Sequence, residues 1–199
     1  MRSRGSKAFR IETPRLVVRC WTPDDAELVK DAIDTSLDHL RPWMPWAESE
    51  PSTLEQKRQL LARFAEDFAR GDDAVYGIFD ADERRVVGGT GLHPRLEGNA
   101  REIGYWIRAD ATGRGLAGES TAALTRVAFE VDGVERMEIH VDPDNVRSAA
   151  IPRRLGYELA DGLDGNGHLV FRMLRAAYPR SSAAGAALQA YDDAGARVL

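Results

Sequence analysis

The sequence predicts a single domain of the α/β class. The segment from Arg101 to Val141 reads as a strand, a glycine-rich turn, a helix and a second strand. Elsewhere, β-branched and apolar runs are interspersed with stretches of helical periodicity, which together give about six or seven strands and about four helices. The chain has 199 residues, of which 43% are hydrophobic and 30% charged, as is typical of one globular domain.

The N-terminal part begins with a basic segment, residues 1–8. It has no apolar core, so we expect it to be disordered rather than to act as a secretion signal. Strands follow in residues 9–12 and 16–21. The motif Thr-Pro-Asp-Asp at residues 22–25 then begins the first helix, because threonine caps it, proline fits its first turn and the acids favour the positive end of the helix dipole.

An aromatic loop follows this helix. Residues 40–46 hold two prolines, which exclude a regular helix. Trp43 and Trp46 form an aromatic wall of a binding pocket, or they close the core beneath the loop, since tryptophan offers a wide apolar surface with one donor at its edge.

The middle of the chain supplies a long helix and a hairpin. Ser52, with Glu55 three residues later, predicts a capping box that begins a helix ending near Arg70. Residues 74–79 and 86–92 form the hairpin, and Gly88-Gly89 indicates a bulge or a close contact in its second strand.

The glycine-rich turn of the central unit predicts a site for a phosphate-bearing ligand. Glu102–Ile107 is the strand before the turn, and residues 113–118 begin a helix that ends near Val131. The first amides of a helix have no intrahelical partner and carry partial positive charge, and glycines let a phosphate approach them. Arg114 adds a positive charge.

A dinucleotide is one candidate ligand, because the letters fit Gly-x-Gly-x-x-Gly with Asp142 as the ribose-binding acid. However, five residues separate the preceding strand from the glycines, and more than a hundred residues precede the unit. In dinucleotide-binding folds the glycines follow an early strand almost at once. We therefore disfavour this ligand.

The C-terminal part predicts one further helix, a closing hairpin and a tail. Asn145 caps a helix over residues 146–155, and Leu159 with residues 169–173 forms the hairpin. The domain is expected to span residues 9–178, and the Ala/Gly-rich residues 179–199 are expected to form a frayed or weakly helical tail.

Three groups of residues resemble one known family. The turn Gly113-Arg114-Gly115-x-Ala117-x-Glu119 resembles the acyl-CoA loop of the RimJ/RimL-like group of the Gcn5-related N-acetyltransferases, although Thr112 departs from the usual Gln or Arg of the superfamily. A second match is Asn145-x-x-Ser148, followed by Leu-Gly-Tyr at 155–157. The third is Thr-Pro-Arg-Leu-x-x-Arg at 13–19 with Arg-Pro-Trp-x-Pro-Trp at 41–46. The resemblance covers residues 9–175.

This resemblance implies a central, mixed, mostly antiparallel sheet that splays between two parallel strands. It also implies direct transfer of an acetyl group from acetyl-CoA to a primary amine, with the α-amine of a protein or peptide N-terminus as the leading acceptor. The cofactor-binding residues it implies are Tyr105, Trp106, Ile107, Gly113, Arg114, Gly115, Leu116, Ala117, Gly118 and Asn145. The acceptor-binding residues are Trp43, Trp46, Glu102 and His140.

Two catalytic roles are expected on the same basis. The resemblance places the hydroxyl of Ser148 near the CoA sulfur, where it would protonate the leaving thiolate. Glu102 shares a strand face with Gly104 and Trp106 and is the candidate base, with His140 as its rival because imidazole titrates near neutrality. An α-amine, with a reference pKa of about 7.7–8.0, needs only a modest base. Each residue also has a purely structural alternative. Glu102 would be a surface carboxylate paired with an arginine, His140 a structural histidine and Ser148 a serine on the helix surface.

Other acceptors and donors stay open at this stage. They are a small-molecule amine such as an amino acid, an aminoacylated nucleotide or an antibiotic; succinyl-CoA as donor; and acyl-CoA binding without turnover. The net charge of −5 disfavours nucleic-acid binding, and the single cysteine, Cys20, provides no metal cluster. No apolar run is long enough to cross a membrane. We expect a cytoplasmic monomer or homodimer without a metal.

Overall fold

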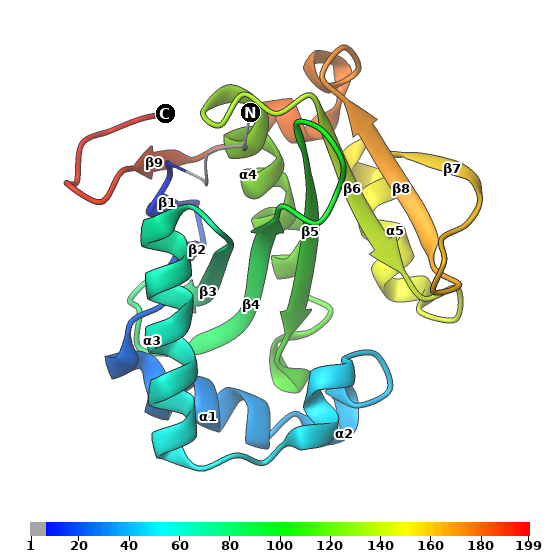
Figure 1. The fold of residues 1–199 in the computed structure, drawn as a ribbon. Coiled ribbons are helices and arrows are strands. Elements are labelled where there is room, and N and C mark those ends of the chain that lie inside the picture. The colour runs from blue at the N-terminus through cyan, green and yellow to red at the C-terminus, as the bar shows by residue number, and fades with distance from the viewer. Residues whose placement is uncertain (1–6) are drawn as a thin grey trace.

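The computed structural model describes residues 7–199, which form one open sheet with helices on both faces (Figure 1). Within them the sheet has nine strands in the order β7-β8-β6-β5-β4-β3-β2-β1-β9. The strands are β1 (Arg10–Glu12), β2 (Leu16–Cys20), β3 (Ala74–Asp80), β4 (Val86–His93), β5 (Ala100–Ile107), β6 (Arg136–Val141), β7 (Glu158–Leu163), β8 (Leu169–Leu174) and β9 (Gln189–Tyr191). The α-helices are α1 (Ala26–Asp34), α2 (Leu37–Leu40), α3 (Leu54–Arg70), α4 (Leu116–Glu130) and α5 (Val146–Leu155). The predicted α/β class is confirmed, with somewhat more strands than expected.

One pair of neighbouring strands is parallel and separates along its length. Every other neighbouring pair is antiparallel. β5 and β6 pair only over Ala100–Glu102 and Arg136–Glu138. Both strands continue beyond these pairs, so they diverge toward their carboxyl ends, as Figure 1 shows. The expected splay between two parallel strands is confirmed.

The helices cover the two faces of the sheet separately, each with its own core. α4 and α5 pack on one face around buried residues that include Ile103, Leu124 and Phe171. α1 and α3 pack on the other face, where Val29 and Leu61 are buried. Residues at alternate positions of β5 therefore belong to different cores.

Local signals in the first half of the chain are mostly confirmed, with one shift in a helix cap. The helix α3 is capped by Thr53, whose hydroxyl accepts a hydrogen bond from the amide of Gln56 at 3.2 Å. The predicted cap, Ser52, lies one residue too early, and its amide donates to the carboxylate of Glu50 at 2.6 Å. The bulge predicted near Gly88 is present as a register shift between β3 and β4.

The aromatic loop contains more helical structure than its prolines suggested. α2 ends at Leu40, and Pro45–Ser49 form a 3₁₀ helix. Proline occupies the first position of that turn, where its missing N–H removes no helical hydrogen bond. Both prolines thus lie outside any regular helix interior.

Both chain ends differ from the sequence prediction where they are described. Of the segment expected to be disordered, residues 1–6 lie outside the described residues, whereas Ala8 is buried and its carbonyl accepts a hydrogen bond from the hydroxyl of Tyr76 at 2.9 Å. The tail is not frayed at residues 189–191, because β9 pairs with β1 and Ala190 is fully buried. β9 covers the free edge that β1 would otherwise expose.

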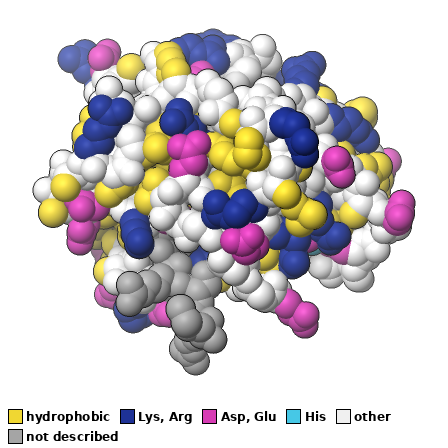
Figure 2. All heavy atoms as spheres, turned by 90° about the horizontal axis from the view of Figure 1, so that it is seen from above, with side chains coloured by type: hydrophobic (Ala, Val, Ile, Leu, Met, Phe, Trp, Pro, Cys, Tyr) yellow, Lys and Arg dark blue, Asp and Glu magenta, His cyan; other side chains and the backbone are white. Residues whose placement is uncertain are grey.

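The face at the top of Figure 1 carries charges of both signs. Figure 2 shows this face, where Lys and Arg side chains are interspersed with Asp, Glu and apolar ones. Among residues 7–199, no helix has both the length and the hydrophobicity that a membrane span requires. The opening between β5 and β6 lies toward the other end of the molecule (Figure 1).

Candidate active site

The candidate site is built around the opening between β5 and β6. The ladder between the two strands stops at Glu102, whereas β5 stays paired with β4 as far as Ile107. Past the last β5–β6 pair, the backbone of residues 104–107 therefore keeps one side free of sheet hydrogen bonds to β6. A ligand that lies between the strands could take the place of the missing ladder.

Alternation along β5 assigns its side chains to two faces. Ile103, Tyr105 and Ile107 pack with α4 and α5. Trp106 packs with the core under α1 and α3, and the same alternation puts Glu102 and Gly104 on that face. The residues predicted for catalysis and binding are thus divided between two sides of one strand.

Tyr105 and Ser148 form a hydroxyl pair on the α5 side. Their side-chain oxygens lie 3.0 Å apart, and the tyrosine hydroxyl also lies 3.2 Å from the Ser148 carbonyl, to which it donates. Burial raises the pKa of Tyr105 to about 12, against the opposing effect of the Ser148 hydrogen bond. The tyrosine is therefore protonated at neutral pH and is a donor. Asn145 caps α5 by accepting from the Ser148 amide at 3.1 Å, as expected.

Glu102 lies on the opposite face of β5, at the point where the ladder ends. It is directly across from His93 on β4 and from Glu138 on β6. Its side chain is 18% exposed, and its nearest ion-pair partner is Arg95, with 3.7 Å between the guanidinium and the carboxylate. The carboxylate is thus accessible and only weakly paired.

His140 is held at both ring nitrogens. Its Nδ1 lies 2.8 Å from the Asp164 carboxylate, and its Nε2 lies 3.1 Å from that of Glu138. Burial lowers the pKa of His140, but the hydrogen bonds to Asp164 and Glu138 and the negative charge of Glu102 outweigh it, so the pKa is raised. While both contacts are made, His140 has no free nitrogen with which to accept a proton.

The aromatic loop reaches β5 through one of its two tryptophans. The rings of Trp46 and Trp106 meet edge to face, with centroids 5.9 Å apart, and Trp46 is 38% exposed. In the described part of the chain this is the ring contact that links the loop to the site, and Trp43 is half-buried without an equivalent contact to β5. Trp46 therefore suits an exposed wall of the opening.

Two glycines of the turn have a backbone conformation that other residues rarely adopt. Gly113 and Gly115 have φ of 76° and 77°, in the left-handed region that favours glycine. Gly115 is the N-cap of α4. The first amide in this helix that donates to a helical carbonyl is that of Glu119, which donates to the carbonyl of Gly115 at 3.1 Å. Backbone amides of residues 115–118 thus remain available for a phosphate, and the exposed Arg114 stands beside them. These residues fit the diphosphate of an acyl-CoA.

Glu119 connects this turn to the residues just before β2, a role that the sequence analysis did not predict. Its carboxylate accepts from the Thr13 hydroxyl at 2.6 Å and from the Arg15 guanidinium at 2.6 Å. Arg15 in turn donates to the carbonyl of Arg114 at 2.9 Å. We call Thr13, Arg15 and Glu119 the turn clamp. The signal was present in the Thr-Pro-Arg motif, which seemed only to open a strand.

Arg108 holds the linker between β5 and the glycine turn from the other side. It is 5% exposed and contacts Asp31 of α1 at 3.1 Å and Asp110 at 2.9 Å. Thr112, the residue that departs from the superfamily pattern, donates its hydroxyl to the carbonyl of Ala109 at 2.9 Å. The Thr112 side chain thus stabilises its own turn.

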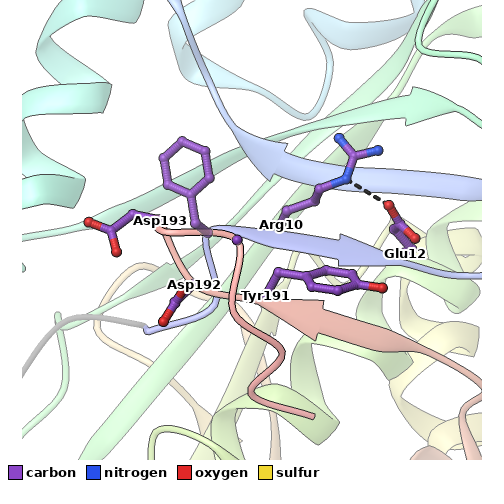
Figure 3. Close-up of a pocket in the computed structure, with 7 residues that line it drawn as sticks. Arg10, Glu12, Tyr191, Asp192 and Asp193 are labelled. Carbon is purple, nitrogen blue, oxygen red and sulfur yellow. Dashed lines mark hydrogen bonds and ion pairs between the residues drawn. The ribbon is translucent and has the colours of Figure 1, made fainter.

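A shallow pocket of about 330 Å³ lies elsewhere, between β1 and β9 (Figure 3). Arg10, Glu12 and Tyr191 line it, and Figure 3 shows Arg10 turned toward Glu12. The guanidinium of Arg10 is already paired with Glu12 at 2.7 Å and with Glu83 at 2.6 Å. Its charge is satisfied within the chain, so this pocket adds nothing to the candidate site.

Comparisons with known proteins agree with this geometry. The family described as Acetyltransferase (GNAT) domain matches residues 15–158. The chain is 29% identical over 154 residues to the [Ribosomal protein uS5]-alanine N-acetyltransferase of Escherichia coli (strain K12), covering 75% of this chain and 78% of that protein.

Solved structures share the fold. A putative ribosomal-protein-serine acetyltransferase from Vibrio cholerae superposes with a TM-score of 0.68 at 25% identity, covering 85% of this chain and 99% of that one. Mycobacterium smegmatis RimJ in complex with CoA-disulfide superposes with a TM-score of 0.72 at 21% identity, covering 88% and 90%.

Proposed function

This chain belongs to the GNAT acetyltransferase family, and we propose that it moves an acetyl group from acetyl-CoA directly to the α-amine of a protein or peptide N-terminus. It is an N-acetyltransferase of the RimJ/RimL-like kind. The observation that carries the proposal is the opening between β5 and β6, with a phosphate-binding turn at one end and a hydroxyl pair on one side.

The donor would be bound by main-chain groups from two elements. The amides at the start of α4 would hold the diphosphate, and Arg114 would add charge. The free side of residues 104–107 would pair with the pantetheine arm, and its amides would meet the charge that develops on the thioester oxygen. Asn145 lies at the N-terminus of α5, where its side-chain amide could contact the pantetheine arm.

The hydroxyl pair would act on the leaving group. When the amine attacks the thioester carbon, the carbon–sulfur bond breaks and the sulfur needs a proton. Ser148 would donate it, and Tyr105, which is protonated at neutral pH and lies 3.0 Å away, would pass a proton to the serine oxygen and regain one from solvent. The structure thus supports the predicted role of Ser148 and adds a tyrosine to it.

The acceptor would approach from the other face of β5. Glu102 is the accessible carboxylate there, and Trp46 with Trp106 offers an apolar wall. A protein N-terminus is the leading acceptor because a curated relative is named for the N-acetylation of an alanine in ribosomal protein uS5. The α-amine also titrates at about 8, far below a lysine, so a modest base suffices.

Mass spectrometry of products tests the proposal. The protein is incubated with acetyl-CoA and a peptide that begins with alanine and carries an internal lysine, and in parallel with the same peptide blocked at its N-terminus. Further reactions replace the peptide by a panel of small amines, or acetyl-CoA by succinyl-CoA. We expect one added acetyl group on the free N-terminus and none on the blocked peptide. Labelling of small amines alone would replace the peptide acceptor by a metabolite. Product from succinyl-CoA but not acetyl-CoA would change the donor, and CoA binding without any product would contradict transfer.

A further inference from the structure

A histidine that the sequence analysis did not single out lies in a recess made by two glycines. A Cβ on Gly91 would come within 2.6 Å of the imidazole of His93, and a Cβ on Gly104 would come within 3.4 Å of its Nε2. Neither glycine has a positive φ, so their backbones would accept other residues. Glycine within a strand weakens it and often marks close approach of another group. Here the group that approaches is the His93 ring.

The ring is oriented by a carboxylate. His93 Nδ1 lies 2.9 Å and 3.0 Å from the two oxygens of Asp73. Because a carboxylate only accepts, Nδ1 carries the proton when the imidazole is neutral, and Nε2 keeps its lone pair. Asp73 is itself fixed, since its Oδ1 also accepts from the amide of Ala74 at 2.8 Å. The free nitrogen therefore has a defined direction.

That direction is toward the candidate site. Nε2 is the ring atom nearest to the position above Gly104, and Gly104 is the first residue on this face of β5 beyond the last pair with β6. His93 is also directly across from Glu102 in the β4–β5 ladder. The side chain is 12% exposed, so a water or an amine has limited access to it.

We propose that His93 is the general base of this acetyltransferase, oriented by Asp73, and this rests on the proposed function. Nε2 takes a proton from the cationic acceptor, directly or through one water, and the neutral nitrogen then bonds to the thioester carbon. The carbon–sulfur bond breaks, the hydroxyl of Ser148 protonates the sulfur, and the second proton lost by the nitrogen replaces the one that Ser148 gave. The proton on His93 leaves to solvent. Glu102 binds the cationic acceptor beside it, and His140, engaged at both nitrogens, does not act as base.

The principal test is His93→Gln, which keeps a polar side chain of similar length. We expect kcat to fall by about 100-fold, within the range of general-base catalysis, with the dissociation constant for CoA unchanged. His93→Ala should recover part of its rate when imidazole is added to the assay. The loss of kcat in both variants should be smaller at high pH, because the acceptor amine is already neutral there. The charged groups next to the ring are Asp73, which contacts Nδ1, and Glu102, which lies directly across the ladder. Arg95 pairs with Glu102, and Arg101 interacts electrostatically with Asp73.

A glycine substitution tests the recess without changing the histidine. Gly91→Ala should displace the ring and lower kcat to a similar extent, because its Cβ would lie 2.6 Å from two ring atoms. Gly185→Ala is the matched control, since nothing lies within 4 Å of its Cβ. His168→Gln, a half-exposed histidine outside this cluster, controls for loss of an imidazole.

Each outcome is decisive. Imidazole rescue with unchanged CoA binding supports the assignment. An unchanged kcat in His93→Gln overturns it. So does a loss of kcat in His93→Ala that imidazole does not rescue and that is accompanied by a lower melting temperature. If Glu102→Gln abolishes turnover while His93→Gln does not, Glu102 is the base. Absence of product from the wild-type protein on every amine would instead refute the proposed function itself.

Discussion

At the scale of single residues, the site depends on groups whose protonation is set by their surroundings. Burial keeps Tyr105 protonated and beside Ser148. Two carboxylates raise the pKa of His140 although burial opposes them. The first environment favours a proton donor, whereas the second favours the protonated form of His140, which pairs with Asp164.

Substitution of the hydroxyl pair should separate chemistry from binding. We expect Ser148→Ala to lower kcat by about 100-fold and Tyr105→Phe by less, because the serine hydroxyl remains. The KM for acetyl-CoA should change little in both. Steady-state kinetics over a pH series measures this, and unchanged kcat in Ser148→Ala would contradict the role assigned to its hydroxyl.

His140 predicts a pH dependence of stability. Its pKa is raised in the folded state, so its contribution is fully present below the unfolded value of about 6.5 and is lost as pH rises through the folded pKa. The wild-type protein should therefore exceed His140→Gln in urea midpoint most clearly at pH 6, and the difference should shrink at pH 9. An equal difference at both pH values would show that the charge contributes nothing.

At the scale of elements, two loops at the site are fixed by contacts far away in sequence. The turn clamp joins the start of α4 to the turn before β2. The aromatic loop is closed at its base by Glu50, whose carboxylate pairs with Lys57 of α3 and whose carbonyl accepts from Arg41 at 2.9 Å. The first contact involves the start of α4 and the second involves α3, so each joins a loop to a helix.

Loss of the turn clamp should weaken donor binding selectively. Glu119→Ala removes the acceptor of both Thr13 and Arg15, and we expect the dissociation constant for CoA to rise by about tenfold, or ~1.4 kcal/mol. The acceptor KM should not change. Isothermal titration with CoA measures the effect, and Glu66→Ala, an exposed helix glutamate on α3, is the control. Equal affinities in the two variants would show that the clamp does not position the turn.

The ion pair between Lys57 and Glu50 should contribute to the free energy of unfolding. Lys57 is 1% exposed and Glu50 7%, so Lys57→Met leaves a buried carboxylate without its cation. We expect a loss of about 3 kcal/mol in the free energy of unfolding. The double variant Lys57→Met/Glu50→Gln should lose less than the sum of the single changes. Urea denaturation measures this, and additive losses would argue against a coupled pair.

At the scale of the whole molecule, the C-terminal tail completes the sheet. β9 lies against β1 at the edge opposite β7, and the end of the chain returns to Ala190, whose carbonyl accepts from the amides of Val198 and Leu199. The tail thus protects an edge that is remote from the opening between β5 and β6.

A charge in this edge should destabilise the fold without affecting the site. Ala190 is fully buried, so Ala190→Asp should detach β9 and lower the melting temperature by about 5 °C, with ~2–4 °C expected per kcal/mol for a domain of this size. Gln189→Glu, at an exposed neighbouring position, should have little effect. Loss of CoA affinity in Ala190→Asp would show that the tail supports the site as well as the edge.

Features that depend on neighbouring residues could be predicted before the structure was known. The glycine turn, the cap at Asn145 and most strands and helices were predicted because their signals lie within a few residues of each other. The tail was wrongly predicted because an Ala/Gly-rich segment has weak local preference, and pairing with β1 decided its structure.

Contacts between residues far apart in the chain could not be predicted in this way. Pairing of β4 with β5 placed His93 over Gly104, and packing of α5 on the sheet brought Ser148 to Tyr105. Glu119 reached Thr13 across more than a hundred residues. Such contacts depend on strand register and helix packing, which follow from burial of whole faces rather than from any local motif.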